Sequence, residues 1–445
     1  MDSSVTDGHK VFAEAESQAR SYCRSFPVIF DRAQGSLLYD VQGQAYIDFL
    51  SCAGSVNYGH NPEPVKAALI DYLQDNGIQG ALDMHSRAKQ AFIQAFRRII
   101  LEPRALAYTM QFTSPTGTSV VESAIKLARK VTGRRHVVSF TNGFHGMSGT
   151  SLGLTGSRDN RQPGVDPYVF RLPYEHYLPG LDSIAYFERL LNDNSSGLDL
   201  PAAVILETVQ GEGGINMASA EWLQRLRQLT AAHDILLIVD DIQAGCGRTG
   251  TFFSFEPSGI TPDMVCLSKS LSGYALPFAL LLHHPELDQW RPGEDNGTFR
   301  GNSLAFVAAT RTLETFWCDE RLVEHIKVSE AHLQRWLGQV SERFAVHIKA
   351  IRGRGLFYGI EFHDASRAAE VMRACFERHL IIERCGPEDQ VLKLMPALTI
   401  DTPTLHTGLE RLFAAMHQVL GRTGSQAPGN DLDTLRTTRE VADVN

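Results

Sequence analysis

Two short apolar runs in the middle of the chain each stop at a residue with useful chemistry, and they constrain the fold most strongly. Residues 235–239 read Ile-Leu-Leu-Ile-Val and end at Asp240. Met264–Leu267 is a second run, and Lys269 follows it after one serine. Continuous apolar runs of this kind are typical of strands covered on both faces. Because the carboxyl ends of parallel strands line one crevice, the sequence predicts a carboxylate and an amine in the same cleft.

Strand and helix patterns alternate around these two runs, as they do in an α/β fold. Apolar runs predict strands at Val137–Phe140 and Ala203–Leu206, and helical periodicity predicts helices at Ser119–Val131 and Trp222–Ala232. Short joints between strand, helix and strand indicate βαβ units and a parallel sheet. Ala275–Leu282 is a further apolar strand, which we expect to run antiparallel to the others.

An aspartate and a lysine at neighbouring strand ends fit the cofactor pyridoxal 5'-phosphate (PLP). The lysine can form a Schiff base with it, and the carboxylate can pair with its protonated pyridine nitrogen. Position alone does not decide this, since most strand-end Asp and Lys residues are solvated surface groups. Thr116, Gly117 and Thr118 open the helix predicted at 119–131, where backbone N–H groups attract phosphate. An ordinary threonine N-cap explains the same three residues.

The segments DDIQAGCGRTG and PDMVCLSKSLSG, which contain Asp240 and Lys269, resemble the pattern of class III (ω-type) aminotransferases. The likeness extends over most of the chain, through pieces such as FTNGFHGM, ETVQGEGG and NGTFRGN. The resemblance implies the type I fold of PLP-dependent transferases. That fold is α/β, with a mostly parallel seven-stranded sheet flanked by helices and a small α+β domain.

The resemblance also implies roles for single residues. Lys269 would hold PLP and move the proton during catalysis, and Asp240 would keep the ring nitrogen protonated. The other cofactor contacts that the resemblance implies are Thr116, Gly117 and Thr118 at the phosphate, Phe144 stacked on the ring, His145 in support, Glu207 in the network below the cofactor, Gln243 near the phenolic oxygen, and Thr298 of the neighbouring subunit at the phosphate. A contribution from Thr298 would make the protein a homodimer with shared active sites.

The residues expected to bind substrate depart from the family pattern. Relatives that act on ornithine or GABA carry an arginine that grips the glutamate carboxylate, and a glutamate masks it until a dicarboxylic substrate arrives. Glu212 matches the masking residue, but Lys393 stands in place of the arginine. Lysine lacks the guanidinium fork that clamps a carboxylate with two bonds. Either Lys393 does this less tightly, or Arg24 or another cation does it.

Within the class, the chain is most similar to diaminobutyrate–2-oxoglutarate transaminases. This likeness implies transfer of the 4-amino group of L-2,4-diaminobutyrate to 2-oxoglutarate, in a pathway such as ectoine or siderophore biosynthesis. Another ω-aminotransferase, using ornithine, GABA, β-alanine or a specialised amine, is the alternative, because motifs that bind the cofactor do not select the donor. A mutase or decarboxylase of the same fold, or a catalytically dead scaffold, are further alternatives.

Composition excludes several other classes of function. The net charge of −9, without basic clusters, argues against nucleic-acid binding. Apolar runs are too short to span a membrane, and the first residues lack a secretory signal, so we expect a cytoplasmic protein. The seven cysteines are dispersed and the histidines lack metal-ligand spacing, so we expect reduced thiols and no metal.

Changes in pattern along the chain predict its domain organisation. After residue 300, long amphipathic helices and short strands replace the alternating strands and helices. We expect an N-terminal segment (1–60) joining the small domain, a large PLP-binding domain (61–300), a C-terminal small domain (301–421) and a polar, disordered tail (422–445).

Overall fold

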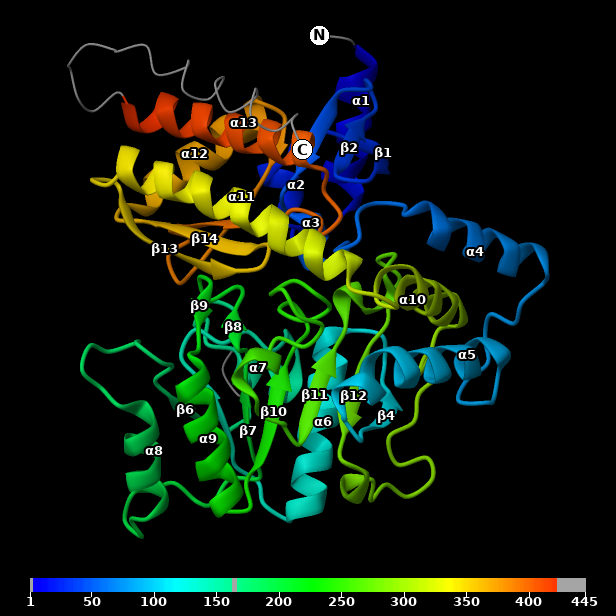
Figure 1. Ribbon diagram of the computed structural model, residues 1–445, viewed down its shortest axis with the longest axis vertical. Helices are drawn as coiled ribbons and strands as arrows, with labels where there is room; N and C mark the ends of the chain where they lie inside the picture. The colour runs from blue at the N-terminus through cyan, green and yellow to red at the C-terminus, as the bar shows by residue number, and fades with distance from the viewer. Residues whose placement is uncertain (1–2, 162–165, 422–445) are drawn as a thin grey trace.

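The computed structural model describes residues 3–161 and 166–421, and a seven-stranded sheet with helices on both faces forms its larger, lower part in Figure 1. The strand order is β4-β12-β11-β10-β7-β5-β6, and β12 alone runs antiparallel to its neighbours. The strands of this sheet are β4 (Thr109–Phe112), β5 (Val137–Phe140), β6 (Val169–Leu172), β7 (Ala203–Leu206), β10 (Leu236–Asp240), β11 (Met264–Leu267) and β12 (Leu280–His283). The predicted fold class is confirmed.

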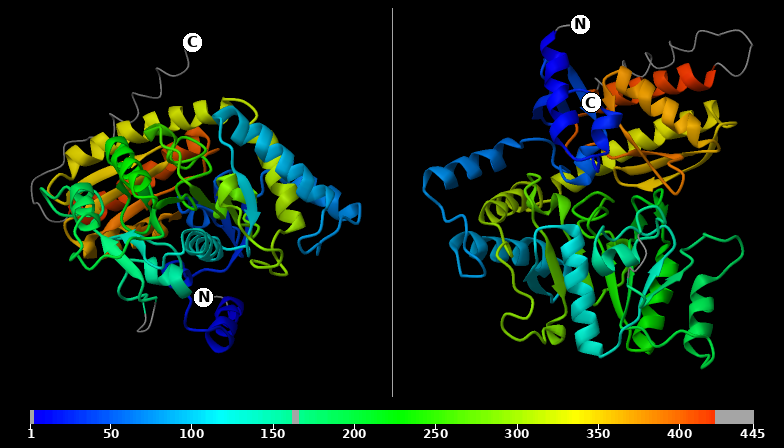
Figure 2. Two further views of the ribbon diagram at one scale, coloured as in Figure 1. Left: turned by 90° about the horizontal axis from the view of Figure 1, so that it is seen from below. Right: turned by 180° about the vertical axis from the view of Figure 1, so that it is seen from behind.

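Helices pack on this sheet and on the smaller sheets above it (Figures 1 and 2). The helices are α1 (Ser3–Ala15), α2 (Tyr22–Ser25), α3 (Ser51–Gly54), α4 (Glu63–Gln74), α5 (Arg87–Phe96), α6 (Gly117–Thr132), α7 (Gly149–Leu154), α8 (Ser183–Leu191), α9 (Ala220–Ala232), α10 (Ser303–Phe316), α11 (Arg321–Arg343), α12 (Ala365–Glu377) and α13 (Thr402–Leu420).

The predicted strands at 137–140, 203–206 and 264–267 are confirmed to the residue as β5, β7 and β11. The antiparallel member is also confirmed, although it begins at Leu280 rather than Ala275. Pro277 lies between these positions and has no N–H to donate to a sheet ladder. The sequence predicts irregular structure over 157–177 because the segment is rich in Pro, Arg and Tyr; this prediction is wrong, since β6 lies within it.

Successive side chains of the central strands point into two separate hydrophobic cores. Ile238 of β10 lies in one buried cluster with Leu127 of α6, and the next residue, Val239, lies in another with Leu226 of α9. A strand presents successive residues to opposite faces, so both neighbours are buried only if helices cover both faces. The apolar run before Asp240 is therefore continuous because α6 covers one face of the strand and α9 covers the other.

Two four-stranded sheets form the smaller part of the molecule, at the top of Figure 1. An antiparallel sheet, in the order β13-β14-β17-β16, packs against α11 and α12, and the N-terminal strands β1, β2 and β3 join β15 through a parallel β3–β15 pair. The strands are β1 (Phe30–Gln34), β2 (Leu37–Asp40), β3 (Ala45–Asp48), β13 (Ile348–Arg354), β14 (Phe357–Phe362), β15 (Leu380–Ile381), β16 (Glu383–Cys385) and β17 (Val391–Leu394); the two-stranded ribbon is β8 (Val209–Gln210) and β9 (Asn216–Met217).

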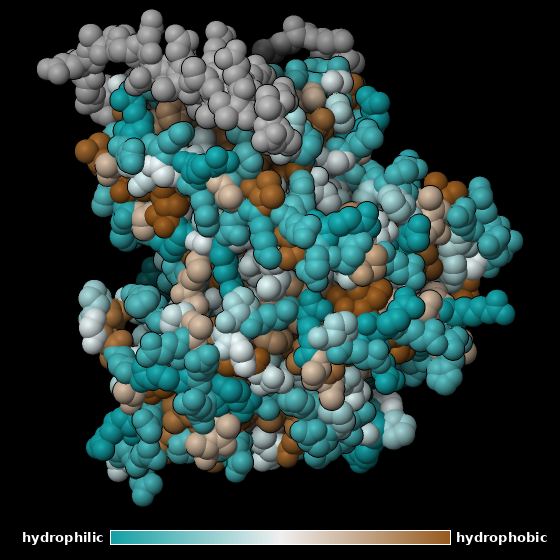
Figure 3. Space-filling view, in the orientation of Figure 1, coloured by the Kyte–Doolittle hydropathy of each residue, from teal (hydrophilic) through white to brown (hydrophobic). Residues whose placement is uncertain are grey.

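The domain boundaries at residues 60, 300 and 421 stay predictions. The predicted disordered tail, 422–445, lies outside the described residues. In the described part of the chain, no helix is long and apolar enough to cross a membrane. The face of the molecule in Figure 3 is largely hydrophilic, with hydrophobic side chains in small groups.

A buried arginine joins the loop after β10 to the smaller part. Arg248 is fully buried, and its guanidinium donates to the carbonyl oxygens of Leu356 (3.0 Å) and Pro396 (2.6 Å) and to Oδ1 of Asn57 (2.6 Å). Three acceptors satisfy a charge that would otherwise be costly to bury. These bonds fix the position of β17, which begins five residues before Pro396, relative to the end of β10.

Packing of aromatic rings between α5, α10 and the sheet predicts a large effect of one substitution. Phe92 is fully buried, and its ring lies 5.1–6.0 Å from those of Phe96, Phe112, Phe278 and Phe306. We expect Phe92→Ala to lower the free energy of unfolding by about 3–5 kcal/mol, because it leaves a cavity.

Urea unfolding followed by fluorescence measures this loss. Ile93→Ala is the control, since the neighbouring side chain on α5 is 36% exposed and its truncation costs about 1 kcal/mol or less. Equal losses in the two variants would contradict the packing described here.

Candidate active site

Asp240 and Lys269 lie at the same edge of the central sheet. β10 and β11 are parallel, and Asp240 pairs in register with Cys266, three residues before Lys269. Lys269 opens a short turn with a φ of +45°, in the left-handed region, which costs about 1–2 kcal/mol for a residue other than glycine. Such strain is characteristic of functional sites. The sheet thus brings the two predicted residues to the same edge.

The Lys269 amine is not engaged by its surroundings. No hydrogen bond or ion pair joins it to another residue in the ranges 3–161 and 166–421. Burial lowers the pKa of this amine, although the Glu212 carboxylate opposes the shift. An unpaired amine with a lowered pKa is suited to covalent bonding and to proton transfer.

Asp240 is bound to a buried histidine. Nδ1 of His145 lies 2.7 Å from Oδ2 of Asp240, and both side chains are almost fully buried. Burial disfavours the charged imidazole, but the bond to Asp240 outweighs it and raises the pKa of His145. The second oxygen of Asp240 accepts only a long bond, 3.3 Å, from the N–H of Ile242. That oxygen is therefore available to a cationic ring nitrogen.

Glu207 holds the backbone of two neighbouring loops in place. Its carboxylate accepts from the backbone N–H groups of Phe144 (2.9 Å) and Gly211 (3.2 Å). Burial, reinforced by the charge of Asp240, raises the pKa of Glu207 to about 7. The Phe144 ring is half-buried, so one part of it remains accessible, as a stacking surface requires.

The N-terminus of α6 meets the edge of the sheet at a glycine. A Cβ on Gly117 would lie 3.2 Å from Cδ1 of Ile242, so a larger residue would crowd the helix start against the loop after β10. Thr116 caps the helix by accepting from the N–H of Ser119 (3.1 Å), and Thr118 accepts from the N–H of Met147 (3.2 Å). Thr116 is thus an ordinary N-cap, as the alternative interpretation of the sequence predicts. Such a cap is compatible with an anion site at the first free N–H groups.

A second charged cluster surrounds Lys393. Its ammonium lies 2.7 Å from Oε1 of Glu212 and 2.8 Å from Oε1 of Glu383, and Tyr22 donates to Oε2 of Glu383 (3.2 Å). Burial opposes ionisation, but Lys393 lowers the pKa of Glu212 to about 2. Nε2 of Gln243 also donates to Glu212 (3.3 Å), which connects this cluster to the loop after β10.

The sequence analysis missed Glu383 and Tyr22. Glu383 and Lys393 are direct partners in the antiparallel pair of β16 and β17. Pairing the two short apolar runs in this register would have revealed the contact. Tyr22 lies on a four-residue helix without a distinctive pattern, so no signal identified it.

Two predicted residues form no hydrogen bond or ion pair with either cluster in the described part of the chain. The Arg24 guanidinium donates to the carbonyl oxygens of Arg20 (3.1 Å) and Gln18 (2.9 Å) and to the Gln18 side chain, and it is exposed. These contacts do not place it at the substrate site. Thr298 is also exposed in an irregular loop, as a residue reaching a second subunit would be.

The residues at the sheet edge fit PLP. Lys269 supplies an unpaired amine, Asp240 a carboxylate with a weakly bonded oxygen, and the α6 N-terminus a phosphate site. Oε1 of Gln243 is buried without a hydrogen-bond partner among the described residues, as expected of a site that binds a further polar group. A metal is a different matter: within the described ranges, no three His, Cys, Asp or Glu residues are grouped to hold one.

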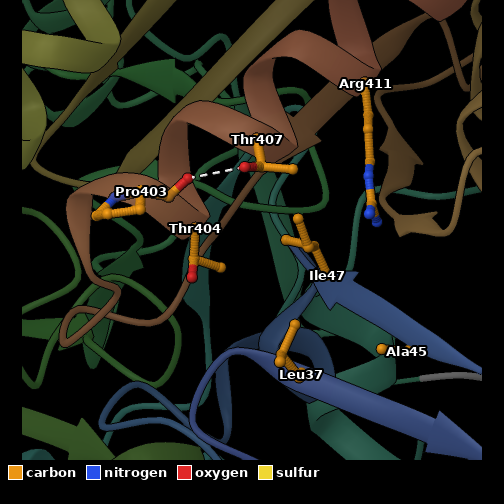
Figure 4. Close-up of a pocket in the computed structure, with 7 residues that line it drawn as sticks. All are labelled: Leu37, Ala45, Ile47, Pro403, Thr404, Thr407 and Arg411. Carbon is orange, nitrogen blue, oxygen red and sulfur yellow. Dashed lines mark hydrogen bonds between the residues drawn. The ribbon is translucent and has the colours of Figure 1, made fainter. Parts of the chain in front are cut away.

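A hollow of about 290 Å³ lies elsewhere, between α13 and the strands β2 and β3 (Figure 4). Its lining residues are Leu37, Ala45, Ile47, Pro403, Thr404, Thr407 and Arg411. It shares no residue with the two charged clusters, and Arg411 is engaged with the carbonyl oxygen of His379 at 2.7 Å. The hollow is therefore separate from the candidate site at the edge of the sheet.

Comparison with known proteins agrees with this geometry. The family model for aminotransferase class-III matches residues 18–416. The chain is a class III aminotransferase. It is 55% identical over 401 residues to a diaminobutyrate–2-oxoglutarate transaminase of Vibrio cholerae, over 90% of this chain and 97% of that protein. A Streptomyces coelicolor protein of the same name is 52% identical over 412 residues, with coverages of 92% and 97%.

Solved structures of this class share the fold of the present aminotransferase. The ornithine aminotransferase of Toxoplasma gondii superposes with a TM-score of 0.82 at 25% identity, over 94% of this chain and 96% of that chain. An S-selective transaminase from Bacillus megaterium gives a TM-score of 0.84 at 22% identity, over 94% and 99%. These likenesses confirm the PLP-dependent type I fold that the sequence predicts.

Covalent trapping tests the position of Lys269. We expect sodium borohydride to fix PLP to the wild-type enzyme at Lys269, because this amine is unpaired at the edge of the sheet. Peptide mass spectrometry locates the adduct. Lys269→Ala is expected to bind PLP without any adduct, and Lys66→Ala, which removes a half-exposed amine on α4, is expected to leave it unchanged. An adduct on a different lysine would refute the assignment.

Proposed function

We propose that this enzyme transfers the 4-amino group of L-2,4-diaminobutyrate to 2-oxoglutarate and gives L-aspartate 4-semialdehyde and L-glutamate. The single observation that carries the chemistry is the unpaired Lys269 amine beside the Asp240–His145 pair. The choice of substrates rests on relatives more than 50% identical over about nine-tenths of the chain, which are named for this reaction.

PLP, when bound, supplies an electron sink for the carbon that loses its proton. Asp240 favours a protonated pyridine nitrogen, since its carboxylate is buried and held by His145. Lys269 acts as the base and acid that moves the proton at the reacting carbon, because its lowered pKa increases the fraction of neutral amine at a given pH.

The remaining cofactor contacts are those implied by the resemblance to class III aminotransferases. Thr116, Gly117 and Thr118 would hold the phosphate at the start of α6, where the helix dipole favours an anion. Phe144 would pack on one face of the PLP ring, and Gln243 would bind its phenolic oxygen. Glu207 holds the backbone of Phe144 in place through a 2.9 Å bond.

We propose that the active enzyme is a cytoplasmic homodimer. Thr298 and Phe299 lie in an exposed loop, and Phe299 is 72% exposed. Thr298 of one subunit would then reach the cofactor phosphate of its partner.

Lys393 is the proposed binding group for the carboxylate of 2-oxoglutarate. It is fully buried and paired with Glu212, so the carboxylate must displace Glu212 to reach it. This exchange matches the family's masking arrangement, with an ammonium in place of a guanidinium. A point charge without the bidentate fork is expected to bind the acceptor less tightly than arginine would.

An isotope experiment tests the reaction and its regiochemistry together. Diaminobutyrate labelled with nitrogen-15 at position 4 is expected to give labelled glutamate, and the 2-labelled compound is expected to give unlabelled glutamate. Mass spectrometry of glutamate measures the transfer, with ornithine and 4-aminobutyrate as competing donors. Label arriving from position 2, or faster transfer from a competing donor, would contradict the proposal.

Substitution of Lys393 tests the acceptor site. We expect Lys393→Ala to raise the KM for 2-oxoglutarate at least about tenfold, since an ionic contact to a buried carboxylate is worth about 1.5–3 kcal/mol. Pyruvate, which lacks the distal carboxylate, is the control acceptor in the same variant, and its KM is expected to stay nearly constant. An unchanged KM for 2-oxoglutarate would dismiss the exchange of Glu212.

A further inference from the structure

Two carboxylates share the Lys393 ammonium. Lys393 lies within 2.8 Å of both Glu212 and Glu383, and it is the only cation that either carboxylate pairs with in the described part of the chain. Lysine carries one positive charge, so the cluster holds one excess negative charge when both carboxylates are ionised. Burial raises the pKa of Glu383, and the Lys393 ammonium opposes this shift by favouring the carboxylate. Since Lys393 and Glu383 are both buried, solvent compensates little of the excess charge.

The excess charge is presented on one accessible oxygen. Oε1 of Glu212 accepts both from Lys393 (2.7 Å) and from Gln243 (3.3 Å). Oε2 of Glu212 accepts no hydrogen bond from the residues that the structure describes, and the side chain is 34% exposed. The bond from Gln243, which lies in the loop after β10, holds this carboxylate at the edge of the sheet that carries Asp240. Glu212 therefore presents a free oxygen to the cleft.

Glu383, in contrast to Glu212, is buried and has no accessible free oxygen. It pairs with Lys393 across the β16–β17 ladder, and its second oxygen accepts from the Tyr22 hydroxyl at 3.2 Å. Oε1 forms an ion pair with Lys393 but no hydrogen bond among the described residues, Oε2 accepts from Tyr22, and the residue is 6% exposed. Without Glu383, Lys393 and Glu212 would form a neutral pair, and little charge would remain on the free oxygen.

We propose that Glu383 is a specificity-determining, positioning residue: it neutralises Lys393, so that the free oxygen of Glu212 binds the 2-ammonium group of the donor. This inference rests on the proposed function, and it deepens the choice of donor. Diaminobutyrate carries a second ammonium two carbons from the one it transfers. 4-Aminobutyrate has the same carbon chain and carboxylate but lacks that group, so the cluster discriminates between the two donors.

Selectivity between these donors is the test. The ratio of kcat/KM for diaminobutyrate to kcat/KM for 4-aminobutyrate is measured on the PLP-loaded enzyme. In Glu383→Gln we expect the ratio to fall about 10- to 100-fold, as the loss of a charged hydrogen bond predicts. Both constants come from the same preparation, so a loss of folded enzyme cancels in the ratio. Tyr22→Phe, which removes one bond to Glu383, should lower the ratio less.

The control is Asp389→Asn, which makes the same change in net charge on the β16–β17 hairpin. Asp389 is 61% exposed and pairs with Arg384 instead of Lys393. We expect this variant to keep the wild-type ratio. An equal fall in Asp389→Asn, or an unchanged ratio in Glu383→Gln, would overturn the inference. If the wild type fails to use diaminobutyrate, the proposed function fails with it, whereas a selective wild type and an equally selective Glu383→Gln reject this inference alone.

Discussion

Parallel pairing of β10 with β11 is the constraint on which the site depends. The ladder sets Asp240 opposite Cys266, so the chain reaches Lys269 immediately beyond the sheet edge where Asp240 lies. Helices α6 and α9 bury both faces of these strands and prevent any slip of register, since a shift of one residue would exchange the two cores. The same edge receives the N-terminus of α6, where a phosphate can bind.

Paired buried charges are the second feature of this edge of the sheet. Buried ions are tolerated only when they are paired, and the site contains two sets of pairs that share no member. Asp240 and His145 form the first, beneath the cofactor position. Glu212, Lys393 and Glu383 form the second, toward the substrate. In the proposed reaction, the first would keep the pyridine nitrogen protonated, and the second would select substrates by their distal charged groups.

Most of the sheet and its two central residues could be predicted, because buried strands leave continuous apolar runs and Asp240 and Lys269 follow them directly. The local sequence pattern does not predict the contacts of the other site residues. Glu383 acts through cross-strand register, which a sequence does not display until its strands are paired. The contacts of Arg24 are local carbonyl groups, which a resemblance to family motifs does not reveal. Thr298 concerns a second subunit, so the fold of one chain leaves its role a prediction.

Visible absorbance of the purified, PLP-supplied enzyme tests the central claim most directly. The spectrum is recorded before and after single additions of diaminobutyrate, ornithine, 4-aminobutyrate, β-alanine and glutamate. Lys269 and the charged cluster predict a band of covalently bound cofactor that bleaches fastest with diaminobutyrate and also bleaches with glutamate. Bleaching by glutamate but not by diaminobutyrate would contradict the donor, and the absence of any band would contradict the assignment of the site.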